Sequence, residues 1–355
     1  MLRIKHQDKK NNAIFFILAI PAIVLLILGI KMGINLIFSG NKTISPPVSS
    51  NQLLSKSHYQ TNIALNQDGN IYLEENNIFR KYTIEVSKDS SVEASEDNKK
   101  AILIDFKNGD KLALNSKGKK IDDFKDINLD KSNGKNTLKI NKKFSENNFV
   151  YINDVKNIKS IVILISKVEK PLTHKAVLDA GHGGEDAGTN IGNLFEKNLT
   201  LKIVKYMISD LVYNGVETIL TRDKDELLSL AQVADIANRN NPDVFMSVHI
   251  NSSNYRKQTP GVQTYYYYES GAAESERINF ANVAMKHIVK SDGWENKGVL
   301  KNNYKVLRLC KYPSTLVECG YMNNAEDRAR MQDDEVLARL AANLSEAIVE
   351  YVKSK

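Results

Sequence analysis

Cysteine is scarce in this chain of 355 residues, which contains only Cys310 and Cys319. Two cysteines exclude a fold that is built on a disulfide framework, because such scaffolds need several bridges in a short chain. Two interpretations of the pair stay open at this point. The thiols could pair in an oxidising compartment, or they could be small buried side chains within apolar strands.

A large excess of charge of one sign is also missing. The 49 lysines and arginines stand against 42 aspartates and glutamates, which gives a formal net charge of +7, and the acidic residues are spread through the chain. This balance argues against nucleic acid as a partner and fits a polyanionic surface, such as a membrane or a cell wall, better. The length allows two domains.

One long apolar run is present, from Ala13 to Ile30, and apolar residues continue to Phe38. It is long enough to cross a bilayer as a helix, which takes about 20 residues. The basic flank favours a cytoplasmic N-terminus by the positive-inside rule. We therefore expect a cytoplasmic tail (1–12) and a single-pass transmembrane anchor (13–38) in the cell membrane, with the rest of the chain outside. A cleaved signal peptide is the alternative, but its apolar core is usually about 7 to 15 residues long.

The segment after the expected anchor divides into a linker and a β-rich part. Residues 39–56 combine Pro, Ser, Gly and Asn without apolar periodicity, which is typical of a flexible tether. Residues 57–168 contain short apolar runs, such as "YTIEV", "AILIDF" and "SIVILIS", separated by turn signals such as "NGD" and "NGK". This pattern predicts a small, mainly β module. It contains no cluster of His, Cys and acids, so its role and ligand stay unknown.

Strand-like and helix-like segments alternate over residues 171–355. Apolar runs such as "AVLDA", "VETILT", "DVFMSVHI", "GVQTYYYY", "YKVLRL" and "STLVEC" are typical of strands, whereas "EKNLTLKIVKYMISDLVYNG" and "DEVLARLAANLSEAIVEYV" have helical periodicity. Such alternation predicts an α/β domain with an open sheet covered by helices and with its site at strand ends.

Four side chains at element ends are candidates for chemistry. His182 follows a strand within "AVLDAGHGGEDAG", His249 ends "DVFMSVHIN", and Glu196 begins the first long helix. Two imidazoles and one carboxylate suit a catalytic zinc with an open position for water. Glu318, in "PSTLVECGYMNN", is an acid at the tip of an apolar strand. Each of the four also has a simple structural explanation, and no H-E-x-x-H helix is present to decide between the two.

Six sequence blocks resemble, in order, the motifs of the zinc-dependent N-acetylmuramoyl-L-alanine amidases of the amidase-3 type. These blocks are "LDAGHGGEDAG", "EKNLTLKI", "TILTRDKD", "ADIANRNNPDVFMSVHIN", "GVQTYYY" and "PSTLVECGYMNNAED". The resemblance implies that His182, Glu196 and His249 bind zinc and that Glu318 is the catalytic acid/base. It implies an open, mostly parallel sheet flanked by helices. It also implies that the domain hydrolyses the amide between N-acetylmuramic acid and the L-alanine of the stem peptide in peptidoglycan.

Three positions depart from the motifs. Ala187 replaces a proline, Cys319 stands where a small hydroxyl residue is frequent, and Gln232 stands where arginine is common, which puts a supporting salt bridge in doubt. Two other functions remain as alternatives. The chain could be another zinc hydrolase of peptidoglycan, such as a carboxypeptidase or a deacetylase, or an inactive wall-binding membrane protein.

Overall fold

The computed structural model describes residues 70–87, 89–97, 100–106, 126–130, 136–142, 147–155, 158–253, 260–269 and 273–355. The expected cytoplasmic tail, transmembrane anchor and linker (1–56) lie outside these residues. Among the helices of the described residues, none is long and apolar enough to cross a membrane.

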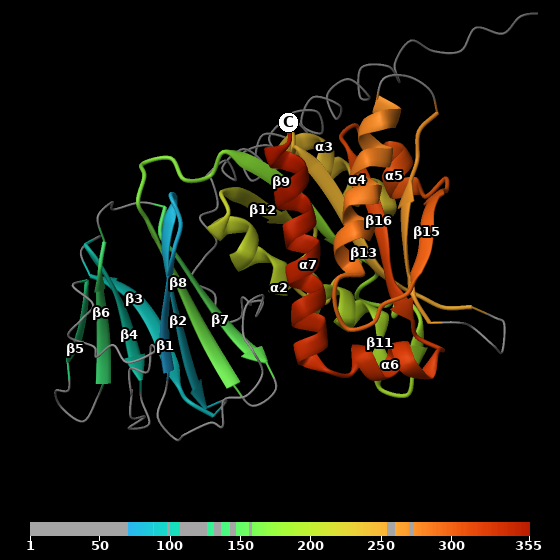
Figure 1. Cartoon of the computed structure of the whole chain (residues 1–355). Helices are drawn as coiled ribbons and strands as arrows, with labels where there is room; N and C mark the ends of the chain where they lie inside the picture. The colour runs from blue at the N-terminus through green and yellow to red at the C-terminus, as the bar shows by residue number, and fades with distance from the viewer. Residues whose placement is uncertain are drawn as a thin grey trace, which may run out of the picture. The chain divides into compact units, whose positions relative to one another are not determined.

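The described residues up to Ser166 form two four-stranded antiparallel sheets (Figure 1). The first sheet has the order β1-β2-β8-β7, and the second has the order β3-β4-β6-β5. Their bounds are Asn70–Glu75 (β1), Phe79–Ser87 (β2), Val92–Asp97 (β3), Ala101–Phe106 (β4), Ile127–Asp130 (β5), Asn136–Asn141 (β6), Phe149–Val155 (β7) and Ile158–Ser166 (β8).

Both sheets contribute side chains to one shared apolar core. Ile84 and Ile163 from the first sheet and Ile104 and Leu138 from the second are fully buried in the same cluster. Burial of an aliphatic side chain of this size contributes about 1.5–3 kcal/mol. Strands β4 and β6 bury alternate residues, as a strand with one covered face does, whereas β8 is buried continuously from Ser160 to Ser166.

A six-stranded sheet forms the centre of the second half of the chain, with the order β12-β9-β13-β16-β14-β15. Four of its neighbouring pairs are parallel, and β14 runs antiparallel to β16. The expected mostly parallel sheet is thus present, with one reversal. The strands are His174–Ala180 (β9), Val216–Leu220 (β12), Val244–Asn251 (β13), Val262–Tyr266 (β14), Asn296–Lys301 (β15) and Ser314–Tyr321 (β16); a small hairpin has the strands Asn190–Ile191 (β10) and Leu194–Phe195 (β11).

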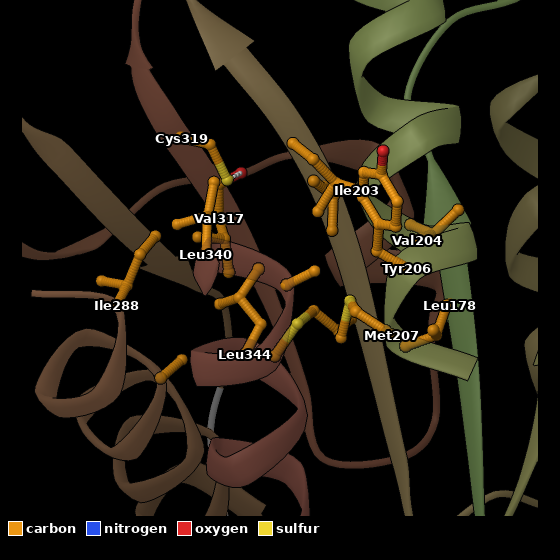
Figure 2. Packing of buried hydrophobic residues seen from close by; sticks show 14 of the residues in the cluster. Leu178, Ile203, Val204, Tyr206, Met207, Ile288, Val317, Cys319, Leu340 and Leu344 are labelled. Atoms are coloured by element: carbon orange, nitrogen blue, oxygen red, sulfur yellow. Dashed lines mark hydrogen bonds between the residues drawn. The ribbon is translucent and has the colours of Figure 1, made fainter. Parts of the chain in front are cut away.

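Helices cover both faces of this sheet. Helices α2, α4 and α7 pack with alternate strand residues into one large core, of which Figure 2 shows Leu178, Met207, Val317 and Leu344. Helices α3 and α5 pack on the opposite face, around Phe245 and Leu316. The helices are Glu196–Tyr213 (α2), Leu230–Asn240 (α3), Ala273–Ile288 (α4), Lys305–Leu309 (α5), Ala325–Met331 (α6) and Asp334–Lys353 (α7).

One expectation about local structure is wrong, and the structure adds detail on three side chains that the sequence left open. The segment "YKVLRL" is not a strand, because Lys305–Leu309 forms the short helix α5, with Val306 and Leu307 packed against α3.

Cys310 and Cys319 are both free and buried, so they form no disulfide, and only Cys319 lies in a strand. The side chain of Gln232 accepts a hydrogen bond from the backbone N–H of Ser229 and completes a capping box at the start of α3.

Helix α2 also packs against strands of the β-rich part. Ile208 and Val212 share an apolar cluster with Phe149 and Leu164. In the same helix Asp210 is buried, and Lys81 is the cation that acts on it. Burial raises the pKa of Asp210 to about 7, although Lys81 opposes the shift. The folded protein therefore binds a proton at Asp210 more tightly than the unfolded chain does.

This shift predicts that the variant Asp210→Asn is more stable than the wild type at neutral pH. A raised carboxyl pKa adds stability below the unfolded pKa of about 4, and that stability is lost as the pH rises towards 7. Asparagine resembles the protonated acid, so the free energy of unfolding should rise by on the order of 1 kcal/mol at pH 8 and by much less at pH 4. Urea unfolding at both pH values measures this. The control Asp235→Asn alters an exposed aspartate on α3. Equal shifts in both variants, or none in Asp210→Asn, would contradict the assignment.

Candidate metal centre and active site

The loop after β9 holds His182 in a backbone conformation that side chains seldom adopt. His182 has a φ of 64°, and the next two glycines also have positive φ. Such strain in a residue other than glycine is typical of functional sites. Gly181 is needed for a different reason, since a Cβ there would lie 2.4 Å from the ring of His249. The glycines around His182 therefore bring the two imidazoles close together.

His182, Glu196 and His249 form one cluster, in which one ligand atom from each lies within 4.8 Å of the others. Glu196 Oε1 lies 3.2 Å from His182 Nε2 and 3.0 Å from His249 Nδ1. The imidazole rings meet edge to face, with centroids 4.9 Å apart. The structure thus brings together all three residues that the sequence analysis assigned to a metal.

This donor set fits a zinc ion. Zinc takes His nitrogen and carboxylate oxygen at about 2.0–2.2 Å in a tetrahedral arrangement, so its ligand atoms lie about 3.4 Å apart. The Oε1–nitrogen distances of 3.2 and 3.0 Å are close to this separation, and all three ligand atoms lie within 4.8 Å of one another. A site with three protein ligands would leave a fourth position open, as in catalytic zinc sites.

Neighbouring groups hold His182 and Glu196 in place. Asp186 Oδ2 lies 2.7 Å from His182 Nδ1, which leaves Nε2 to face the cluster. The carboxylate of Glu196 accepts hydrogen bonds from two backbone N–H groups, that of Thr189 on Oε2 and that of Ile250 on Oε1. A carboxylate that binds a metal needs such partners to fix its orientation.

Mutual electrostatics make Glu196 a strongly ionised acid. Burial alone would raise its pKa, but the hydrogen bonds and charges of the two histidines outweigh burial and lower it to about 2. For His182 burial acts downward, and Glu196 and Asp186 raise the pKa to about 9. Without a metal the cluster is therefore an ion-paired group of a charged carboxylate and imidazoles that hold their protons tightly. A metal ion would have to displace those protons, because a histidine binds metal in its neutral form.

Glu318 lies on β16 directly beside His249 of β13, its partner in the parallel register. Its Oε2 atom is buried and, among the described residues, has no hydrogen-bond partner. Burial raises the pKa of Glu318 to about 7, although His249 opposes the shift. A carboxyl group with a pKa near the working pH is suited to general acid/base catalysis. The structure thus places Glu318 next to the cluster and outside the ligand set.

Arg222 is a residue that the analysis of single motifs missed. Its buried guanidinium donates hydrogen bonds to the carbonyl oxygens of Ala180, Gly181 and Lys197. It therefore ties the end of β9 and the loop that carries His182 to the first turn of α2. The signal was present in the block "TILTRDKD", where an arginine directly follows a strand.

The β13–β9 pair has a second buried support in Asp179. Its carboxylate accepts hydrogen bonds from Ser247 Oγ and Thr221 Oγ1. Ser247 lies on β13, and Thr221 directly follows β12; these are the two strands that flank β9 in the sheet. Asp179 therefore fixes the edge at which His182 and His249 meet, and it has no contact with the cluster among the hydrogen bonds of the described residues.

Comparison with known proteins finds sequences similar to the second half of the chain. The family model Amidase_3, described as N-acetylmuramoyl-L-alanine amidase, matches residues 176–350. The chain is 34% identical over 181 residues to an endolysin of Bacillus phage SPP1, and the match covers 50% of this chain and 66% of the endolysin. It is 28% identical over 189 residues to the N-acetylmuramoyl-L-alanine amidase LytC of Bacillus subtilis, which covers 53% of this chain and 38% of LytC. The chain thus spans less than two thirds of the length of each of these two relatives.

A solved structure with similar sequence is the catalytic domain of CwlV, an N-acetylmuramoyl-L-alanine amidase from Bacillus (Paenibacillus) polymyxa var. colistinus. It is 33% identical with a TM-score of 0.47, and the alignment covers 52% of this chain and all of that domain.

Proposed function

Residues 176–350 belong to the Amidase_3 family of N-acetylmuramoyl-L-alanine amidases, and on this premise we propose that the chain hydrolyses peptidoglycan. The bond cleaved is the amide between N-acetylmuramic acid and the L-alanine of the stem peptide. One observation supports the proposal above the others. The His182–Glu196–His249 cluster has Glu318 beside it in the strand register, which combines a metal-binding set with a separate acid.

The metal that we propose for this cluster is zinc, bound by His182, Glu196 and His249. Zinc in such a site polarises a carbonyl group and lowers the pKa of a bound water to about 7. Two further roles at the site belong to residues of the protein. Glu196 would supply one negative charge that partly neutralises the divalent cation, and Asp186 holds His182 in the orientation in which Nε2 faces the site.

Glu318 is the proposed carrier of the proton. Its carboxylate takes a proton from the attacking water and returns it to the leaving amine, because an amide nitrogen cannot leave readily without protonation. The buried Oε2 atom suits this task, since among the described residues no neighbouring group competes for the proton by hydrogen bonding. The raised pKa of Glu318, about 7, lets the group act in both directions near neutral pH.

We further propose that the chain stays attached to the cell membrane through residues 13–38, with the amidase domain on the extracytoplasmic side. The support is the apolar run from Ala13 to Ile30 and its basic flank. The protein should therefore remain with the membrane fraction after a carbonate wash. A soluble form that begins near Ser39 would contradict this proposal.

Purified protein should release new amino termini from peptidoglycan, and a chelator should abolish that release. The amino group freed should belong to L-alanine, because cleavage occurs at the first residue of the stem peptide. Labelling of free amino groups, followed by hydrolysis and identification of the labelled amino acid, measures this. Release of D-alanine would indicate a carboxypeptidase, and loss of acetyl groups a deacetylase. If no wall preparation reacts, the proposed hydrolysis is wrong, and the alternative of an inactive wall-binding protein applies.

The variants Glu318→Gln and Glu196→Gln should separate proton transfer from metal binding. Glu318→Gln should retain zinc and the fold but lose at least about 100-fold in kcat, because general acid/base assistance is worth about 10² to 10⁴. Glu196→Gln should lose zinc and activity together. Metal analysis, thermal unfolding and amino-terminus release, measured side by side, test this. Near-normal turnover in Glu318→Gln would show that another group moves the proton.

A further inference from the structure

A row of three side chains crosses neighbouring strands at the edge where the cluster lies. His249 of β13 pairs with Glu318 of β16 in the parallel register, and Glu318 pairs with Gln263 of β14 in the antiparallel register. Residues directly opposite each other on paired strands point to the same face of the sheet, with Cβ atoms about 4.5–5.5 Å apart. Gln263 is therefore the next side chain beyond Glu318 on the side away from His249.

The side-chain oxygen of Gln263 is surrounded by donors. Gln263 Oε1 accepts hydrogen bonds from Asn251 Nδ2 at 2.9 Å, from Tyr265 Oη at 3.0 Å and from Tyr321 Oη at 2.8 Å. The amino group of Asn251 can only donate a hydrogen bond, so the atom of Gln263 that faces it must be the oxygen. These contacts therefore fix the orientation of the Gln263 amide. The same contacts leave the amino group, Nε2, on the other side of the amide.

Gln263 Nε2 is thus available to a ligand. Among the described residues it has no hydrogen-bond partner, and the Gln263 side chain is only partly buried. Its neighbour Glu318 has a buried oxygen atom that also has no partner among them. Two adjacent polar groups whose hydrogen-bonding capacity is unused, at the edge of a reaction site, indicate a place for polar atoms of the substrate.

The order of the row indicates which part of the substrate lies there. If the scissile carbonyl is held at the His182–Glu196–His249 cluster and the leaving nitrogen is protonated by Glu318, the chain beyond that nitrogen continues towards β14. That chain is the stem peptide, whose first acceptor is the carbonyl oxygen of L-alanine. Sugar atoms lie on the acyl side, away from Gln263.

We propose that Gln263 is a substrate-binding residue for the leaving peptide, and that its Nε2 group donates a hydrogen bond to a peptide carbonyl oxygen near the amino end of the stem. This inference rests on the proposed amidase function. It adds a residue that recognises the product peptide and that neither binds the metal nor moves a proton.

The test compares inhibition by the two halves of the substrate. L-Alanyl-D-isoglutamine represents the peptide side, and N-acetylmuramic acid represents the sugar side. The variant Gln263→Met removes the donor with little change in volume. One neutral hydrogen bond contributes about 0.5–1.5 kcal/mol, so the inhibition constant of the dipeptide should rise by about 2- to 10-fold, while that of the sugar should stay unchanged.

Tyr321→Phe is the matched control, because it removes one hydrogen bond to Gln263 Oε1 and leaves Nε2 and two other orienting donors. It should change either inhibition constant by less than about 2-fold. Three results in Gln263→Met would overturn the inference. The inhibition constants of the dipeptide and the sugar could rise equally, that of the sugar could rise alone, or neither could rise. These outcomes are distinct from a failure of the proposed function, in which the wild-type protein would release no L-alanine amino termini from peptidoglycan.

Discussion

The buried carboxylate of Glu196 is the group on which the rest of the site depends. It is the first residue of α2, so the start of the helix sets its position, and a negative charge there also interacts favourably with the helix dipole. Its oxygens accept hydrogen bonds from the backbone N–H groups of Thr189, which directly precedes the β10–β11 hairpin, and of Ile250 on β13. They also contact both His182 and His249. One residue therefore joins the helix, the loop and the strand that together form the candidate metal site. Burial of such a charge is tolerated because two backbone N–H groups and two imidazoles are its partners.

Much of this arrangement follows from sequence patterns that physical reasoning can interpret. Apolar runs that alternate with amphipathic helices predict the α/β sheet, and polar residues at the ends of such runs predict where chemistry lies. His182 and His249 are 67 positions apart (249 minus 182), yet they meet because β9 and β13 are parallel neighbours whose carboxyl ends share one edge. The alternation of strands and helices predicts the edge of the sheet at which the two histidines lie. That their imidazoles come into contact depends on the loop conformation at Gly181 and His182, which no periodicity encodes.

Other features could not be predicted because they depend on contacts between distant segments. The run Lys305–Leu309 is too short for periodicity to distinguish a helix from a strand, and its packing against α3 decides the outcome. A buried arginine such as Arg222 has meaning only when the carbonyl oxygens that surround it are known. The segment with the clearest sequence signal, the apolar run from Ala13 to Ile30, lies outside the described residues, so its role continues to rest on composition alone.

The single antiparallel pair in the sheet has a consequence for the site. In a wholly parallel sheet the first residues of β14 would lie at the edge opposite to the ends of β13 and β16. Because β14 runs against β16, its second residue, Gln263, lies opposite Glu318. Asp327 fixes this junction, since its Oδ2 accepts hydrogen bonds from the backbone N–H groups of both Gly261 and Tyr321. Gly261 has a φ of 145°, and a Cβ there would lie 2.6 Å from a backbone oxygen of Glu295, so a side chain at this entry would displace the strand. The reversal therefore extends the edge of the candidate site by one strand, and it places neutral amide and phenol groups on the side of Glu318 away from the His182–Glu196–His249 cluster.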